Sequence, residues 1–199
     1  MKPAFILLSL LAAVTVFSSI SREQSSSSPN AATKQEPAPN HATNLSSRVP
    51  VPKPDDVKSL DAILHALYDV ISGPAGDRDW NRLRSLFVPE ARLTSAQKNK
   101  DGSLFVVDVE GYIKDAGGYF KTHGFYEQAI VNRVQKFGNI AQAFSSYESR
   151  NAPNEKPFAR GVNSIQAFTD GSRWWVISIL WDEENPTNPL PPDLATPAK

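Results

Sequence analysis

The stretch Arg173-Trp174-Trp175-Val176-Ile177-Ser178-Ile179-Leu180-Trp181 decides the fold of this chain, because it reads as a β-strand that is apolar on both of its alternating faces. Such a strand has to be covered on both sides. One face is predicted to line a core or a pocket, and it carries Trp175, Ile177, Ile179 and Trp181. The other face needs a second layer or a partner chain, and it carries Trp174, Val176 and Leu180.

Four strand-like runs, of which this stretch is the last, follow one another with short turns between them. They cover residues 127–137, 140–150, 160–168 and 173–183. Gly138-Asn139 separates the first two runs, and Thr169-Asp170-Gly171-Ser172 separates the last two. Because turns this short join antiparallel neighbours, the runs predict a four-stranded meander.

Helical spacing of apolar residues dominates the chain before the meander. The spacing runs from Val57 to Ile71 and stops at Ser72-Gly73-Pro74, which predicts a first amphipathic helix. Asp79 can cap a second, shorter helix that carries residues 80–87 and is closed by Pro89. Two helices are therefore expected to precede the sheet.

A hairpin and a third helix complete the predicted elements. Residues 91–96 and 104–107 flank a polar turn that contains Lys100-Asp101-Gly102, which predicts the hairpin. Asp108 can cap the third helix, which extends to Phe120. This order of elements excludes the parallel α/β classes. It predicts an α+β fold, a cone-shaped roll in which N-terminal helices pack on a strongly curved antiparallel or mixed β-sheet.

The two ends of the chain differ from its middle in composition. Residues 1–21 have the charged start, short apolar core and small-residue exit of a signal peptide, with Ser19 and Ser21 at the cleavage positions. The prediction is an exported protein, periplasmic or secreted, with no membrane span after cleavage; the alternative is an uncleaved anchor. Residues 22–54 read as a disordered Ser/Pro-rich linker and residues 185–199 as a Pro-rich tail. Residues 55–184 remain as one domain.

Composition limits the chemistry that the chain can perform. The sequence has no cysteine, three histidines and a formal net charge of zero. The lack of cysteine excludes disulfides and thiolate ligands. With only three histidines as well, we expect no metal site and no cofactor. Basic residues are scattered, so nucleic acid is not an expected partner.

At this point the chain resembles the nuclear transport factor 2-like (NTF2-like) superfamily, which includes SnoaL-like cyclases and ketosteroid isomerases. The resemblance covers about residues 55–184. It rests on the element order, on Asp79-Trp80 followed by Pro89-Glu90-Ala91, and on Phe168-Thr169-Asp170-Gly171 before the last strand. The resemblance implies a pocket inside a conical sheet and pairing through the outer sheet face. A homodimer is therefore expected.

The resemblance also implies a test of the isomerase reaction, which needs a carboxylate base opposite a phenol and a carboxylic acid. The family's phenol falls on Tyr68, but its base falls near Ser95 and its acid near Ser164. A hydroxyl cannot abstract a carbon-bound proton at neutral pH without a neighbouring base. The serines therefore argue against isomerase activity, and the chain is not expected to be an enzyme.

The residues expected to bind a ligand are polar or aromatic groups on the predicted pocket face. They are Tyr68, Ser95, Tyr147, Ser164, Gln166 and Trp181. Ordinary core packing is the alternative role for these side chains.

Three other groups of polar residues have competing interpretations. His123 and Glu127 are four residues apart and can act as a base and its orienting carboxylate, or His123 can be a solvated loop residue. Residues 61, 65 and 69 (Asp, His, Asp) share a helical face that reads as solvated rather than as a metal site. A charged group forms either ion pairs or an anion site at the rim, and its members are Arg133, Glu148, Arg150 and Arg160.

The preferred functional hypothesis is an exported SnoaL-like domain that binds a small, largely apolar molecule in a conical pocket and has no catalytic dyad. The alternative is a lyase, cyclase or isomerase that uses Tyr68 with His123 or Glu127 on a small polycyclic or carbonyl substrate. A third hypothesis is a module that docks another protein. A buried ionisable group with a strongly shifted pKa would favour the enzyme.

Overall fold

The computed structural model describes residues 44–98 and 102–196. All the described residues belong to one compact unit. The predicted signal peptide and most of the predicted linker therefore lie outside the described residues. Within the described ranges, no helix is long and apolar enough to cross a membrane.

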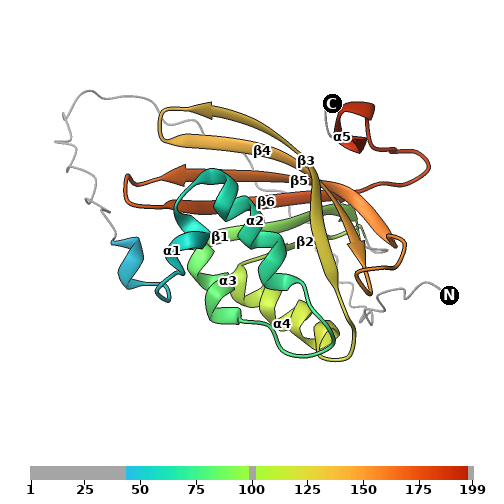
Figure 1. The fold of residues 1–199 in the computed structure, drawn as a ribbon, viewed down its shortest axis with the longest axis horizontal. Helices are drawn as coiled ribbons and strands as arrows, with labels where there is room; N and C mark the ends of the chain where they lie inside the picture. Colours follow the sequence, from blue (N-terminus) through green and yellow to red (C-terminus); the bar gives the residue numbers. More distant parts are fainter. Residues whose placement is uncertain (1–43, 99–101, 197–199) are drawn as a thin grey trace, which may run out of the picture. The chain divides into compact units, whose positions relative to one another are not determined.

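Short helices precede and interrupt the sheet, as the sequence predicts (Figure 1). They are η1 (Leu45–Ser47), α1 (Pro54–Val57), α2 (Leu60–Ile71), α3 (Trp80–Leu86), α4 (Val109–Phe120) and α5 (Pro192–Ala195). The predicted caps Asp79 and Asp108 are confirmed, because each side chain accepts the backbone N–H three residues later. The first predicted helix is divided in two, since Ser59 caps α2 separately from α1.

Six strands form one mixed sheet in the order β2-β1-β6-β5-β4-β3. They are β1 (Phe87–Lys98), β2 (Leu104–Val107), β3 (Tyr126–Phe137), β4 (Ile140–Arg150), β5 (Ala159–Thr169) and β6 (Trp174–Glu183). The predicted antiparallel meander of β3 to β6 is confirmed, and β6 then pairs with β1 in parallel. The fold is α+β, with α2 and α4 on one side of the curved sheet (Figure 1).

The second predicted helix, residues 80–87, extends beyond α3, and the first predicted strand, residues 91–96, is shorter than β1. β1 starts at Phe87, inside the range predicted to be helical, and Pro89 lies within the strand. Pairing between β1 and β6 shifts between Phe87 and Arg92, so Pro89 stands where the ladder is already interrupted. Proline has no N–H to donate, so an interruption of this kind tolerates it.

β4 shows how the sheet separates two environments. Ser145 and Tyr147 are buried, and the neighbouring positions Gln142 and Phe144 are exposed. We call the side of Ser145 and Tyr147 the inner face, because α2 contacts it through a hydrogen bond between the hydroxyls of Tyr68 and Ser145. We call the opposite side the outer face. Strand pairing then assigns the remaining residues to one face or the other.

β6 does not keep the alternation that its sequence predicts. Its pairing with β5 shifts, so that Ala167 pairs with Val176, Gln166 pairs with Ser178, and Ile177 is the extra residue between them. Val176 is fully buried, Trp174 is 6% exposed and Ile177 is 40% exposed. Of the two predicted covers, a second layer or a partner chain, Trp174 and Val176 have the first, because the domain's own core covers them. Leu180, the third member of that set, is 47% exposed.

Both ends of the described chain pack on the domain. Leu45 and Val49 contact the core, and Arg48 forms an ion pair with Glu90, so this part of the predicted linker has structure. At the other end, Leu194 in α5 is buried, and Arg133 on β3 donates to the backbone oxygen of Asp193. The predicted tail is thus fastened to the edge of the sheet.

Candidate functional site

The end of α2 is fastened to the start of β3. The hydroxyl of Ser72 donates to the backbone oxygen of Glu127 over 3.1 Å and accepts from the backbone N–H of Glu127 over 2.9 Å. Beside this contact, Gly73 and Phe125 exchange two backbone hydrogen bonds of 2.7 and 3.0 Å. These four bonds fix the backbone of Glu127, and strand pairing with Ser149 directs its side chain to the inner face.

The carboxyl group of Glu127 is partly buried and weakly partnered. Its Oε2 atom accepts a hydrogen bond of 2.7 Å from the hydroxyl of Ser149. Burial, and to a lesser extent the negative charge of Glu183 on β6, raise the pKa of Glu127 to about 7 in spite of that bond. Glu127 therefore exists in both protonation states near neutral pH.

Tyr68 joins three elements through its hydroxyl group. Its oxygen lies 2.5 Å from the hydroxyl of Ser145 on β4, and it accepts a bond of 3.1 Å from the side-chain amide of Asn163 on β5. Burial and then the charge of Glu127 raise the pKa of Tyr68 well above its ordinary value, so the phenol stays protonated.

Tyr147 lies across Gly161, its cross-strand partner on β5. A Cβ atom at position 161 would stand 2.7 Å from the Tyr147 hydroxyl, so glycine leaves the space that the phenol occupies. Tyr147 is 4% exposed, and its hydroxyl makes no hydrogen bond with the described residues. Burial and the charges of Glu127 and Glu183 raise its pKa. Burial and the charge of Glu127 also raise the pKa of Tyr112 on α4.

Aromatic side chains continue this inner face toward β1 and β2. Trp181 pairs with Asn163 on one side and with Ser95 on the other, and its ring meets the Phe105 ring edge-on at 6.0 Å between centroids. The hydroxyl of Ser95 accepts the N–H of Gln97. Trp181 is partly exposed, so solvent reaches this part of the inner face.

We call this set of inner-face residues the interior cluster. Its members are Tyr68, Tyr112, Glu127, Ser145, Tyr147, Ser149, Asn163, Trp181 and Glu183. Several members are partly exposed, and they include Tyr112, Glu127, Asn163, Trp181 and Glu183. The cluster combines phenols, carboxyl groups and an indole in a largely apolar surrounding, which suits an apolar molecule with one or two polar groups.

The structure brings together four of the six predicted ligand-binding residues and separates the other two. Tyr68, Tyr147, Trp181 and Ser95 are on the inner face, whereas Ser164 and Gln166 are on the outer face. The hydroxyl of Ser164 lies 3.4 Å from the side chain of Gln142, and Gln166 accepts from Ser178 over 3.0 Å. The prediction assigned the wrong face of β5 to the interior. Gly161 and Asn163 face inward in place of Ser164 and Gln166.

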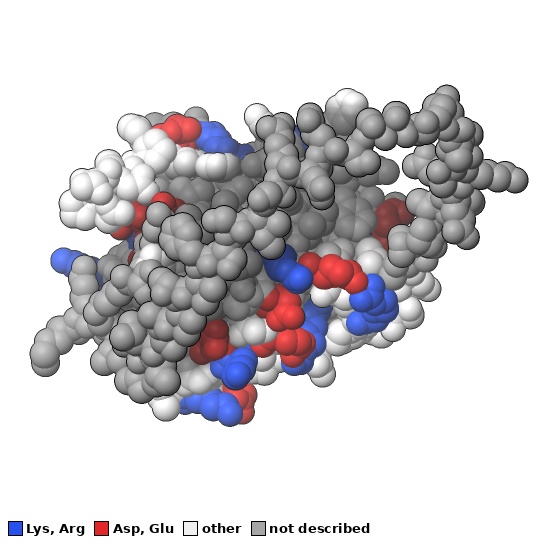
Figure 2. Space-filling model, turned by 180° about the vertical axis from the view of Figure 1, so that it is seen from behind, with Lys and Arg blue, Asp and Glu red and all other residues white. Residues whose placement is uncertain are grey.

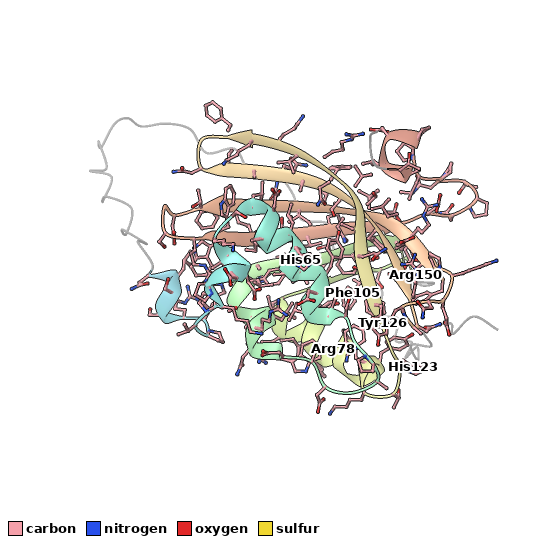
Figure 3. The ribbon with its side chains drawn as sticks, in the orientation of Figure 1. His65, Arg78, Phe105, His123, Tyr126 and Arg150 are labelled. Atoms are coloured by element: carbon pink, nitrogen blue, oxygen red, sulfur yellow. The ribbon has the colours of Figure 1, made fainter. Side chains whose placement is uncertain are left out.

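Two of the competing interpretations can be judged from contacts. His123, labelled in Figure 3, is exposed and stacks on Tyr119 at 4.3 Å between ring centroids. Its Nδ1 atom shares a hydrogen bond of 2.8 Å with the hydroxyl of Thr122. His65 is exposed on α2, and Asp69 pairs with Arg82 over 2.5 Å. In the described part of the chain, no group of three or more His, Cys, Asp or Glu residues is placed to hold a metal ion.

The charged group on the meander forms ion pairs. Arg150 pairs with Glu148 over 2.6 Å, and Arg160 pairs with Glu184 over 3.3 Å. Figure 2 shows acidic and basic side chains intermixed on the visible part of the face turned away in Figure 1. These arginines are therefore matched by acids of the same chain.

Two hollows lie in the described surface, and Glu183 of the interior cluster lines the second of them. One of about 380 Å³ is bounded by α2, α3 and the loop that contains Gly73 and Arg78. Arg78 donates to four backbone oxygens around that loop, so its guanidinium has a structural role. The other, of about 60 Å³, lies between the ends of β5 and β6 and the tail that contains Leu190.

The sequence reasoning missed the polar members of the cluster on β4 to β6. Ser145 and Ser149 are two residues on either side of Tyr147, so alternation from Tyr147 would have found them. Asn163 and Glu183 require the register between strands, which only the structure provides.

Solved structures that are similar to this chain have low sequence identity to it. A protein of unknown function with a cystatin-like fold from Nostoc punctiforme is 13% identical over 67% of this chain and 98% of that chain, with a TM-score of 0.48. An NTF2-like protein of unknown function from Silicibacter pomeroyi is 14% identical over 64% and 94%, with a TM-score of 0.47. An NTF2-like protein of unknown function from Shewanella baltica is 16% identical over 64% and 98%, with a TM-score of 0.43.

No family model and no curated protein matches the chain. Two of these solved structures are described as NTF2-like. Identities of this size concern the fold alone, so the function has to be argued from the interior cluster.

Proposed function

We propose that this domain binds a small, largely apolar molecule against the interior cluster. The observation that carries the proposal is the partly exposed carboxyl group of Glu127, which stands among phenols and has one hydrogen-bond donor. A carboxyl group can accept about four hydrogen bonds, so most of its capacity remains for a ligand. The rings of Tyr147 and Trp181 supply apolar surface beside it.

A neutral fluorescent probe tests this proposal. N-phenyl-1-naphthylamine should bind and gain fluorescence, and Trp181→Ala should weaken its binding by about 5- to 150-fold, which corresponds to about 1–3 kcal/mol of lost contact. Phe144→Ala is the matched control, because Phe144 is an aromatic residue on the outer face of the same sheet. Equal losses from both variants, or no binding at all, would contradict the proposal.

The pKa of Glu127 favours a second candidate function, which is proton transfer to or from the bound molecule. A carboxyl group with a pKa of about 7 is both a competent base and a competent acid near neutral pH. The phenols of Tyr112 and Tyr147 make no hydrogen bonds with described residues, so each is free to donate to a ligand oxygen. This arrangement restores the enzyme alternative, with Glu127 in place of the two serines.

Hydrogen exchange on a simple ketone tests the second candidate. In D₂O, the protein should accelerate exchange of the acidic C–H protons of 2-tetralone, because the Glu127 carboxylate takes a proton from carbon and returns a deuteron. Glu127→Gln should abolish the acceleration while probe binding persists. Acceleration that survives in Glu127→Gln would remove Glu127 from this role.

Export and pairing accompany the proposed function. The charged start and short apolar core of residues 1–21 support export. Phe144, Leu180 and Val106 support pairing, because they are 45%, 47% and 55% exposed on one row across the outer face. N-terminal sequencing of the exported protein tests the first point, and cleavage after Ser21 is the expected result.

A further inference from the structure

Two carboxyl groups, Glu127 and Glu183, lie on the inner face without a cation beside them. Glu127 pairs with Ser149, and Glu183 pairs with Gly161, which pairs with Tyr147, so the two acids stand on neighbouring inner-face rows. The charge of Glu183 acts on Glu127, and the charges of both act on Tyr147. Among the described residues, no Lys, Arg or His forms an ion pair with either acid.

Three other buried or partly buried acids of the domain, Asp56, Glu148 and Glu184, are matched by arginines of the same chain. Glu184, the residue after Glu183, pairs with Arg160 over 3.3 Å. Asp56 receives two hydrogen bonds from Arg82, of 2.7 and 2.9 Å. Since a partly buried carboxylate is costly without a partner, the unmatched charge of the interior cluster indicates a cation that comes from outside the chain.

Tyr147 gives an independent indication of a ligand. Its side chain is 4% exposed, and its hydroxyl makes no hydrogen bond with the described residues. Buried phenols normally have a partner. The hydroxyl lies over Gly161, the strand partner of Glu183, and the charges of Glu127 and Glu183 both act on it. A ligand N–H group can donate to this oxygen.

The aromatic rings of the cluster suit the same kind of ligand. Trp181 and Phe105 form an edge-on pair on the inner face, and the charge of Glu127 acts on the buried phenol of Tyr112 on α4. Rings of this kind attract cations through their electron-rich faces, and an indole does so most strongly. Carboxylates and aromatic rings together recognise an organic ammonium ion better than a neutral molecule.

We propose that the interior cluster binds a small organic ammonium ion, a protonated amine with an apolar body. The N–H groups of the ammonium donate to Glu127, to Glu183 and to the hydroxyl of Tyr147, while the body lies against the aromatic rings. This inference rests on the proposed binding function and narrows its ligand from an apolar molecule to a cationic one.

Proton release is a necessary consequence of this binding mode. The titratable groups that face Glu127 are Tyr68 from α2, Tyr112 from α4, Tyr147 from β4 and Glu183 from β6. The phenols have raised pKa values and stay neutral, so Glu127 is the group that titrates near pH 7. A bound cation stabilises its carboxylate, so binding expels the proton from the protonated fraction and affinity rises as the pH passes through about 7.

Calorimetric titration with three matched compounds tests the inference. The compounds are 2-phenylethylammonium, 2-phenylethanol and phenylacetate, which share a benzene ring and differ in charge. At about pH 8, the ammonium should bind at least about tenfold more tightly than the alcohol, and phenylacetate most weakly. Glu127→Gln and Glu183→Gln should each weaken ammonium binding about tenfold or more, with less than about threefold change for the alcohol. Glu110→Gln is the control, because Glu110 pairs with Arg84 at an exposed site.

Repeating the ammonium titration at about pH 6.5 in two buffers of different ionisation enthalpy measures the released proton. The unmodified protein should release a proton and Glu127→Gln should release none. Equal affinities for the ammonium and the alcohol would overturn this inference and leave the proposed binding function intact. Tighter binding of phenylacetate would also overturn it. If none of the three compounds binds, the proposed function fails together with the inference.

Discussion

The hydroxyl of Ser149 donates a hydrogen bond of 2.7 Å to Oε2 of Glu127, and this is the one hydrogen bond that the Glu127 carboxyl group receives from the described residues. The bond stabilises the carboxylate, whereas burial and the charge of Glu183 oppose ionisation. Glu127 is thus held close to the point where it gains or loses a proton at neutral pH.

Removal of that bond should raise the pKa of Glu127 further. In Ser149→Ala the carboxylate loses its donor while burial persists, so the titration midpoint should move above about 7. Carboxyl ¹³C NMR across a pH series measures the midpoint. Ser178→Ala is the control, because Ser178 donates to Gln166 on the outer face and should leave Glu127 unchanged.

The stability of the domain should depend on pH through Glu127. Its folded-state pKa of about 7 is above the ordinary value of 4.5, so the stability it contributes is complete below pH 4.5 and is lost as the pH rises through 7. The unfolding free energy of the unmodified protein, relative to Glu127→Gln, should fall by about 2–3 kcal/mol over that range. Urea unfolding of both proteins at each pH measures this difference, and a constant difference would contradict the assignment.

Gly161 should be far less replaceable than a glycine with free space around it. In Gly161→Ala the new Cβ would collide with the Tyr147 hydroxyl and with the backbone oxygen of Asp182, so the domain should lose at least about 2 kcal/mol of stability. Gly118→Ala is the comparison, because a Cβ at this exposed position in α4 meets nothing within 4 Å. It should stabilise the domain by about 0.5–1 kcal/mol. Denaturant unfolding compares the two variants.

The proposed dimer should depend on the outer-face row. Leu180→Glu places a charge between Phe144 and Val106 and should convert a dimer into a monomer with an unchanged circular dichroism spectrum. Val51→Glu is the control, because Val51 is 92% exposed and lies outside the sheet. Sedimentation analysis gives the masses. A monomer before any substitution would rule out this mode of pairing.

The elements of the domain were readable from the sequence because local signals agreed with one another. Asp79 and Asp108 stand where helices begin, and Gly138-Asn139 joins β3 to β4. The start of β1 was misread, because the apolar spacing of residues 80–87 fits a helix and Pro89 is uncommon inside a strand. Pairing with β6 makes Phe87 the first residue of a strand in spite of these local signals.

The site was predicted less completely than the fold, since strand residues face inward or outward according to register. Ser164 and Gln166 were placed inside because nothing in β5 alone distinguishes its two faces. The register shift between β5 and β6 at Ile177 places Trp174 and Val176 in the core, and nothing in the sequence predicts that shift. Tyr68 and Tyr147 were found because a phenol at a regular apolar position is informative by itself.

The five tyrosines of the chain provide the most direct test of the proposed binding function. Tyr68, Tyr112 and Tyr147 belong to the interior cluster, whereas Tyr119 stacks on His123 and Tyr126 pairs with Arg150 at the edge of the sheet. With ring-¹³C-labelled tyrosine, titration with neutral 2-naphthol should shift the first three resonances together, saturably and with one dissociation constant, and leave those of Tyr119 and Tyr126 in place. Shifts confined to Tyr119 and Tyr126, or no saturable shift in any ring, would contradict binding at the interior cluster.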